Sequence, residues 1–211
     1  MVGTAPIAAL LDEDPDLDPY ADRILDAAIE QFAMHGIRRT SVDDVAGAAK
    51  VGRVTVYRRF ATKDQLVRAA WIRHLRRIHA SLSAATEGLV DPMERVIEWF
   101  ALGVHALRDD PLFRRLLMSD RDTVLPYLSV GAAPIHAATT MIVLDGQPRL
   151  RAVLGDHAER VTELFVRIGA SLVVSPGGFT DAGDINQTRS LARQLIEPVL
   201  HAIEQQGESH V

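Results

Sequence analysis

The hydrophobic residues of this 211-residue chain recur mainly at the three- and four-residue spacing of one helix face. From Ala21 onward this spacing predicts a first amphipathic helix. Gly36 is placed to end it, because glycine readily adopts the left-handed conformation common at helix C-termini. The apolar face of this helix consists of Ile24, Leu25, Ala28, Ile29, Phe32 and Ala33. We find no alternating strand pattern, internal repeat or low-complexity tract in the sequence, and we therefore expect an all-α protein.

Two short helices with a tight connection are predicted within residues 41–60. Ser41 is a candidate N-cap, and Asp44 stands three residues later, as in a capping box. A helix of about nine residues, a turn of about three and a helix of about eight match the spacing of a helix-turn-helix motif. The second helix of such a motif can enter the major groove of DNA, which is roughly 12 Å wide.

Capping signals also mark the later helices. Thr62 and Gln65 form a further capping pattern at the start of a helix that we expect to continue to about Thr86. At ~1.5 Å per residue this helix would be roughly 36 Å long, enough to join two domains. Asp-Pro pairs at 91–92 and 110–111 begin two more helices. The expected organisation is a mobile acidic tail (1–18), a three-helix helix-turn-helix DNA-binding domain (19–62), a connecting helix (63–86) and a helical-bundle domain for ligand binding and dimerisation (87–211).

Charge is distributed unevenly along the chain. The formal net charge is −5, but residues 20–80 carry 12 basic against 6 acidic side chains. Within residues 38–63, seven Lys and Arg face only Asp43 and Asp44. This basic block coincides with the predicted helix pair, and clustered positive charge suits a polyanion. Double-stranded DNA is therefore the expected partner.

Several other classes of site lack their usual signals. The absence of cysteine excludes disulfides, thiol catalysis and cysteine-based zinc sites. The sequence has no glycine-rich phosphate loop, nucleophile elbow or clustered histidines, so we expect no enzyme, no metal and no cofactor. The start of the chain does not resemble a signal peptide, and a cytoplasmic location is expected. Residues 123–144 carry no charge, but their prolines and polar residues favour a buried helix over a membrane span.

A further set of residues in the first third of the chain is recognisable: Ile24 to Ala28, Phe32, Gly36, Thr40 to Val42, Val45, Ala46, Thr55 to Tyr57, Phe60, Lys63 and Asp64. With these residues the chain resembles the N-terminal domain of the TetR (tetracycline-repressor-like) regulators. The similarity covers about residues 20–70 and implies a homodimer, an operator with two half-sites and a C-terminal ligand-binding domain. Three positions depart from the family pattern. Lys50 and Val54 stand where glycine is usual, and Gly52 stands where Ser or Thr usually caps the recognition helix.

The resemblance also implies roles for individual residues. Arg53 and Val54 lie at the base-facing start of the recognition helix, where Arg53 would contact guanine and Val54 a thymine methyl group. The positions implied to contact phosphates are Thr40, Thr55, Tyr57, Arg59 and Lys63.

The second domain is expected to hold both a ligand and the dimer interface. A mostly apolar or long-chain ligand is favoured, because few basic residues lie in 90–145. Gly169 is predicted to let helices approach closely at the dimer interface. The candidate pocket residues are Trp99, Phe100, Phe113, Leu117, Tyr127 and Met141. The candidate dimerisation residues are Val161, Leu164, Phe165, Ile168 and Leu172.

The expected function is that of a ligand-responsive repressor, released from its operator when the small molecule binds. Two alternatives remain open at this point. One is a small all-α enzyme with an incidental basic face, and the other is a non-specific DNA-coating protein.

Overall fold

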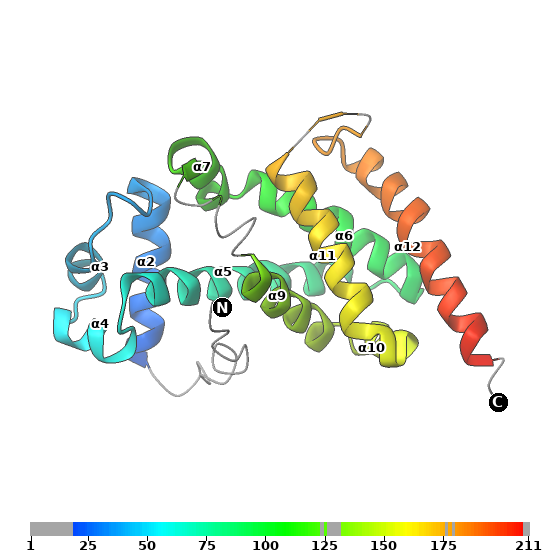
Figure 1. Cartoon of the computed structure of the whole chain (residues 1–211), viewed down its shortest axis with the longest axis horizontal. Coiled ribbons are helices and arrows are strands. Elements are labelled where there is room, and N and C mark those ends of the chain that lie inside the picture. The colour runs from blue at the N-terminus through cyan, green and yellow to red at the C-terminus, as the bar shows by residue number, and fades with distance from the viewer. Residues whose placement is uncertain (1–18, 123–124, 126–131, 176, 179, 209–211) are drawn as a thin grey trace, which may run out of the picture. The chain divides into compact units, whose positions relative to one another are not determined.

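The computed structural model describes residues 19–122, 125, 132–175, 177–178 and 180–208. In these residues the regular structure is entirely helical (Figure 1), which confirms the predicted all-α class. The predicted tail, residues 1–18, lies outside the described residues. The elements are α2 (Pro19–His35), α3 (Val42–Ala48), α4 (Arg53–Arg59), α5 (Lys63–Thr86), α6 (Pro92–Asp109), α7 (Pro111–Ser119), α9 (Ala133–Gly146), α10 (Pro148–Leu154), the 3-10 helix η2 (Gly155–His157), α11 (Ala158–Val174) and α12 (Ile185–Glu208).

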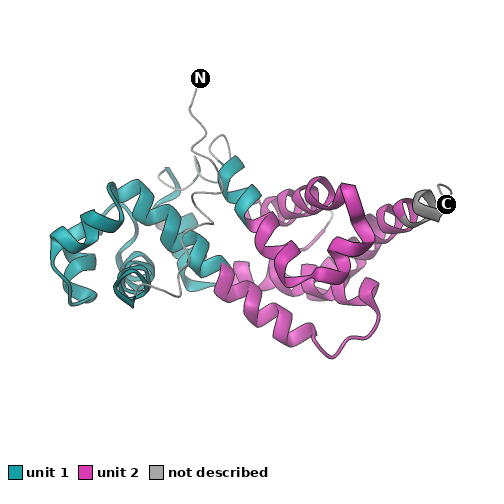
Figure 2. Ribbon diagram, turned by 90° about the horizontal axis from the view of Figure 1, so that it is seen from below, with its two compact units in different colours: residues 1–75, 110–138 teal, residues 76–109, 139–211 magenta. Residues whose placement is uncertain are grey.

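The chain forms two compact units, which are interleaved in sequence (Figure 2). The first unit contains residues 1–75 and 110–138, and the second contains residues 76–109 and 139–211. Helix α7 packs on α2 within the first unit, although the sequence analysis had placed it in the second domain. The compact units therefore do not follow the contiguous boundaries expected at 62–63 and 86–87.

Gly36 lies where the end of α2 closely approaches the end of α7. This residue ends α2 with a φ of +83°, as predicted from its position. A Cβ atom at residue 36 would lie only 1.8 Å from Asp120 Oδ2, at the end of α7. Glycine is thus required here for two reasons, the left-handed backbone and the close approach of the Asp120 carboxylate.

Polar and aromatic contacts hold the first part of α5 to its neighbours in the first unit. Arg73 bridges Asp22 at 2.5 Å and Asp26 at 2.7 Å, both on α2. His74 Nε2 lies 2.8 Å from Asp110 Oδ2 at the N-cap of α7. These long-range contacts fix the first part of α5 against α2 and against the N-terminus of α7.

The predicted boundaries of α5 are confirmed. The helix runs from Lys63 to Thr86, and Thr62 Oγ1 accepts a hydrogen bond from the Gln65 backbone N–H at 3.1 Å. Its Trp71 ring packs against Phe113 of α7 in a tilted arrangement, with the ring centroids 4.4 Å apart. Phe113 is therefore part of the core of the first unit.

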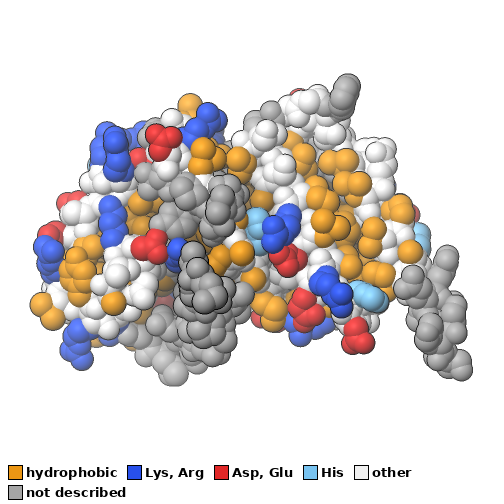
Figure 3. Space-filling model, in the orientation of Figure 1, with side chains coloured by type: hydrophobic (Ala, Val, Ile, Leu, Met, Phe, Trp, Pro, Cys, Tyr) orange, Lys and Arg blue, Asp and Glu red, His pale blue; other side chains and the backbone are white. Residues whose placement is uncertain are grey.

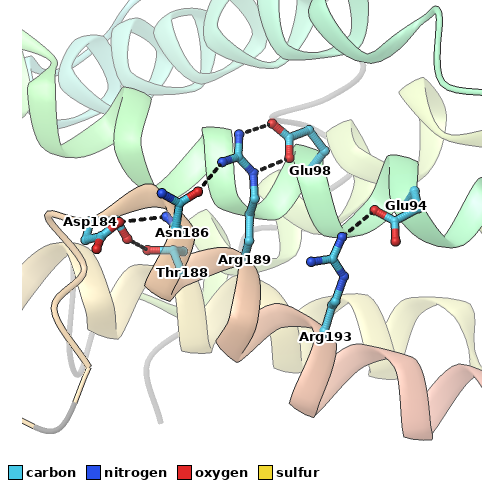
Figure 4. A network of polar contacts seen from close by, with 7 residues as sticks. All are labelled: Glu94, Glu98, Asp184, Asn186, Thr188, Arg189 and Arg193. Carbon is cyan, nitrogen blue, oxygen red and sulfur yellow. Dashed lines mark hydrogen bonds and ion pairs between the residues drawn. The ribbon is translucent and has the colours of Figure 1, made fainter.

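In the second unit, α6 packs on α12 along a ladder of ion pairs (Figure 4). Arg189 donates from Nε and Nη2 to the two carboxylate oxygens of Glu98, each at 2.6 Å. One turn further along, Arg193 pairs with Glu94 at 2.7 Å. The hydrogen bond from Arg189 lowers the pKa of Glu98 below its ordinary value. The bidentate pair therefore keeps Glu98 charged and fixes the two helices in register.

The structure describes residues 125 and 132–144 of the uncharged stretch 123–144, and these include most of helix α9. Helix α9 begins at Ala133, and Ala138, Ile142 and Val143 are buried, in agreement with the predicted burial. Within the described residues, no helix is both long enough and apolar enough to cross a membrane. Helix α10 and the 3-10 helix η2 were not predicted, because a seven-residue helix and a single 3-10 turn show too little periodicity in the sequence.

Candidate nucleic-acid interface

The interface starts from the N-terminus of α3, where the predicted capping box is present. The Asp44 backbone N–H donates to Ser41 Oγ at 3.1 Å, and the Ser41 backbone N–H donates to Asp44 Oδ2 at 2.7 Å. The hydrogen bonds from the Ser41 side chain and backbone lower the pKa of Asp44. The box fixes the residue at which α3 begins, and with it the position of the turn that follows.

The turn between α3 and α4 closes α3 with a left-handed residue. Lys50 has a φ of +53°. Its backbone N–H donates to Gly47 O at 3.1 Å, and the Val51 N–H donates to Ala46 O at 3.0 Å. These two bonds form a Schellman motif, in which the left-handed position is usually occupied by glycine. The motif keeps its hydrogen bonds with lysine, but the lysine backbone is strained.

Helix α4 presents its first turn to the surface. Gly52 precedes it in an extended conformation, with no side chain to cap the helix. Val56 and Phe60 anchor α4 in the core, whereas Val54 is 73% exposed and Tyr57 is also exposed. A large apolar side chain so exposed at the start of a short helix is available for contact with another molecule. The contact of Val54 with a base stays a prediction.

Arg53 is held at the same end of α4 by two neighbours. Its Nη1 donates to Asp43 Oδ2 of α3 at 2.5 Å, and its guanidinium carbon lies 5.4 Å from the centre of the Tyr57 ring. The other arginine predicted at the interface, Arg59, lies over the Tyr20 ring at 5.4 Å. Thr55 is half-buried within α4. The structure thus brings Arg53, Val54 and Tyr57 together on one exposed surface.

Two predicted phosphate contacts have other partners. Thr40 is only 2% exposed, and its hydroxyl donates to Gly36 O at 2.8 Å. The expectation that Thr40 contacts phosphate is therefore wrong for this conformation, because its hydroxyl ties down the end of α2. Lys63 Nζ donates to Ile37 O at 2.6 Å, and partial burial lowers its pKa. The ammonium of Lys63 has further N–H groups beyond this bond.

The predicted pocket residues do not gather in one unit. Trp99, Phe100 and Met141 lie in the second unit. Phe113 and Leu117 are on α7 in the first unit. Tyr127 lies outside the described residues.

Within the second unit, Trp99 is in contact with His79, with their ring centres 5.2 Å apart. Burial lowers the pKa of His79 below its ordinary value. Among the described residues, His79 Nε2 and Trp99 Nε1 are buried without a hydrogen-bond partner. A buried polar atom left in this way costs free energy unless a bound molecule satisfies it.

The predicted dimerisation stripe runs along α11. Leu164 is 51% exposed, whereas the other four residues of the stripe are half-buried. On α12, Leu195 is also exposed, and hydrophobic side chains gather over these two helices in Figure 3. Gly169 faces α6 of the same chain, because a Cβ atom added there would lie 3.5 Å from the Phe100 ring. Its role at a dimer interface stays a prediction.

Asp43 is the residue of this surface that the sequence analysis missed as a site residue. Its ion pair with Arg53 joins residues ten positions apart on different helices. The angle between α3 and α4 decides whether two such side chains meet, and no periodic pattern in the sequence encodes that angle.

Comparisons with known proteins agree with this geometry. Residues 24–70 match the family described as bacterial regulatory proteins, tetR family. Over 184 residues the chain is 26% identical to an uncharacterised HTH-type transcriptional regulator of Mycobacterium tuberculosis, covering 85% of each chain. It is 34% identical over 97 residues to the probable acrEF/envCD operon repressor of Escherichia coli K12, covering 44% of this chain and 43% of that one.

One solved structure shows the same fold along most of the chain. The TetR family repressor AlkX from Dietzia superposes with a TM-score of 0.70 at 19% identity, covering 88% of this chain and 97% of that one. The match at residues 24–70 covers α3, the Lys50 turn and α4, which are the elements that build the exposed Arg53 surface. Residues 24–70 thus form a DNA-binding domain of the tetR family of bacterial regulatory proteins.

Proposed function

We propose that the protein is a cytoplasmic homodimeric repressor that binds a two-half-site operator and is released by a small, mostly apolar ligand. The observation that carries this proposal is the helix-turn-helix with Arg53, Val54 and Tyr57 exposed together at the start of α4. The basic surplus of residues 38–63 supplies the sequence-independent attraction to DNA. The names of two similar proteins, an operon repressor and a TetR family repressor, favour repression over activation.

The proposed DNA contacts divide into two classes. Arg53 and Val54 read base edges, because a guanidinium suits guanine and an aliphatic side chain suits a thymine methyl group. The proposed phosphate contacts, which position the protein on the duplex, are Thr55, Tyr57, Arg59 and Lys63. Alanine at Arg53 is expected to relax sequence preference at one base pair per half-site. Alanine at Lys63 is expected to weaken binding to every sequence and to reduce its salt dependence.

The proposed dimer interface is the exposed apolar face of α11 and α12. Leu164 is the best residue for a test, because it is the most exposed of the predicted stripe. The variant Leu164→Glu is expected to sediment as a helical monomer with weakened operator binding. A matched control is Met118→Glu on α7, which is 80% exposed and is expected to leave the dimer intact. A dimeric Leu164→Glu protein would place the interface elsewhere.

The proposed ligand site lies in the second unit, around Trp99. An apolar molecule that carries an acceptor oxygen would satisfy the buried N–H of Trp99 while burying its own hydrocarbon part. Such a ligand releases DNA only if it binds the non-binding conformation more tightly, so operator DNA must weaken ligand binding by the same factor.

Fluorescence of Trp99 tests this site directly. The chain contains two tryptophans, and Trp71→Phe removes the other signal. We expect long-chain alcohols and acids to change Trp99 emission and to lower operator affinity, with alkanes of equal length binding more weakly. If the alkanes match the oxygenated compounds, the polar part of this site has no role in ligand recognition.

A gel-shift experiment with the DNA upstream of the chain's own gene separates the proposal from its alternatives. A retarded band that only the same sequence competes supports a regulator that recognises a specific operator. Equal competition by any duplex would instead favour a DNA-coating protein. Absence of a shift with upstream DNA, and with a random duplex library, would favour an enzyme with an incidental basic face.

A further inference from the structure

Asp43 and Tyr57 restrain the Arg53 side chain, although this restraint adds little to the stability of the fold. The ion pair between Arg53 and Asp43 spans 2.5 Å, but the two side chains are 59% and 57% exposed. Solvent screens such a pair strongly, so it adds little to folding. The pair is nevertheless well defined, since Tyr57 supports the guanidinium from one turn further along α4. A contact of this kind fixes where the guanidinium lies more than it holds the protein together.

The geometry leaves one edge of the guanidinium available. Nη1 of Arg53 is the atom that bonds Asp43. The opposite edge, formed by Nε and Nη2, still carries N–H groups that can donate in parallel. Guanine presents O6 and N7 as two adjacent acceptors in the major groove. Arg53 can therefore contact guanine through one edge while Asp43 holds the other.

The negative charge of Asp43 lowers the affinity of the protein for DNA of any sequence. It lies in the basic block of residues 38–63, where a carboxylate weakens the attraction for phosphate on every duplex. If Arg53 left Asp43 to bind a phosphate, the carboxylate would remain unpaired beside the DNA. This penalty applies to any complex in which Arg53 leaves Asp43, and not to the complex in which Arg53 contacts guanine and keeps its ion pair.

We propose that Asp43 is a specificity-determining residue that acts through Arg53, restricting the guanidinium to a guanine edge at the cost of affinity for DNA in general. Asp43 is a positioning residue in this role, since the base contact is made by Arg53. The inference rests on the proposed function, because it requires that the protein distinguish one operator from other sequences.

A double-mutant cycle tests the proposal. The wild-type protein first selects its operator from a random duplex library. The affinities of the wild type, Asp43→Ala, Arg53→Ala and the double variant are then measured for the operator, for each single base-pair change and for an unrelated duplex, at one salt concentration. Asp64→Ala serves as the charge-matched control, since Asp64 pairs with Arg68 on α5 and not with Arg53.

The expected result has two parts. Asp43→Ala binds the unrelated duplex about threefold more tightly and loses about tenfold in discrimination at one base pair per half-site. Arg53→Ala loses discrimination at the same base pair, and adding Asp43→Ala to it causes no further loss there. Asp64→Ala strengthens binding to all duplexes without changing discrimination.

Other outcomes overturn the proposal. Equal effects of Asp43→Ala on operator and unrelated duplex would do so, as would a loss of discrimination at a different base pair from Arg53→Ala. Should Asp43→Ala unfold in urea more readily than the wild type, Asp43→Asn, which keeps the side-chain volume, replaces it in the same cycle. A wild-type protein that selects no sequence overturns the proposed function and this inference together, whereas selection without coupling overturns only the role of Asp43.

Discussion

Replacing Lys50 by glycine should stabilise the protein, although it removes a side chain. Lys50 occupies the left-handed position of the Schellman motif that joins α3 to α4, with a φ of +53°. The hydrogen bonds of this motif come from the backbone alone, so they survive the substitution. What the substitution removes is the close contact between Cβ and the backbone that disfavours left-handed conformations for L-residues.

The magnitude follows from two opposing effects. A non-glycine residue in the left-handed region costs about 1–2 kcal/mol. Glycine gives back about 0.5–1 kcal/mol, because its unfolded chain has more conformational freedom to lose. Taking the middle of each range, we expect Lys50→Gly to raise the free energy of unfolding by about 0.7 kcal/mol.

Urea denaturation followed by circular dichroism measures this difference. Lys50→Ala is the matched control, because it removes the same charge but keeps the Cβ atom in the left-handed position. The comparison of glycine with alanine therefore isolates backbone strain from electrostatics. If Lys50→Gly is no more stable than Lys50→Ala, strain at this turn is negligible and the reasoning fails.

Three further predictions concern other described contacts. Arg189→Ala should destabilise the protein by about 1–2 kcal/mol in urea, because its bidentate pair with Glu98 is half-buried. Arg193→Ala, in the more exposed pair between the same two helices, should destabilise it much less, and equal losses would contradict this. The free energy of unfolding should fall as the pH drops below about 6.5, because burial lowers the pKa of His79 and the unfolded state therefore takes up that proton more readily. When the free energy of unfolding is measured against pH, His79→Phe should show a shallower slope than the wild type. An unchanged slope would assign the effect to other groups. Gly36→Ala should lower the melting temperature by several degrees, because of the left-handed backbone and the adjacent carboxylate, and a variant that melts with the wild type would refute that account.

The sequence predicted local features of this fold better than contacts between distant residues. The capping box of Ser41 and Asp44 and the helix from Lys63 to Thr86 were predictable, because their signals lie within a few residues. The ion pair of Glu98 with Arg189 joins residues 91 positions apart, and such a pairing leaves no periodic trace in the sequence.

In the candidate site, too, local features were predictable from the sequence and contacts between distant residues were not. The exposure of Val54 follows from its place at the start of a short helix whose core residues are Val56 and Phe60. The burial of Thr40 does not follow from the sequence, because it depends on how the end of α2 folds back at Gly36. Likewise, Phe113 was expected to line a pocket in the second domain. Its ring packs against Trp71 in the first unit, and this contact between distant residues could not be predicted from the sequence.

The interleaving of the two compact units restricts how this protein can be recombined. The chain passes from one unit to the other after residues 75, 109 and 138, and α7 returns to pack on α2 between the second and third of these points. A single genetic crossover at the end of α5 would therefore graft a foreign sensor onto a DNA-binding part deprived of its own α7. A working chimera must either keep residues 110–138 or receive a helix that covers the same face of α2. New ligand specificities in such an architecture arise more readily by substitutions within the second unit than by exchange of the whole C-terminal half.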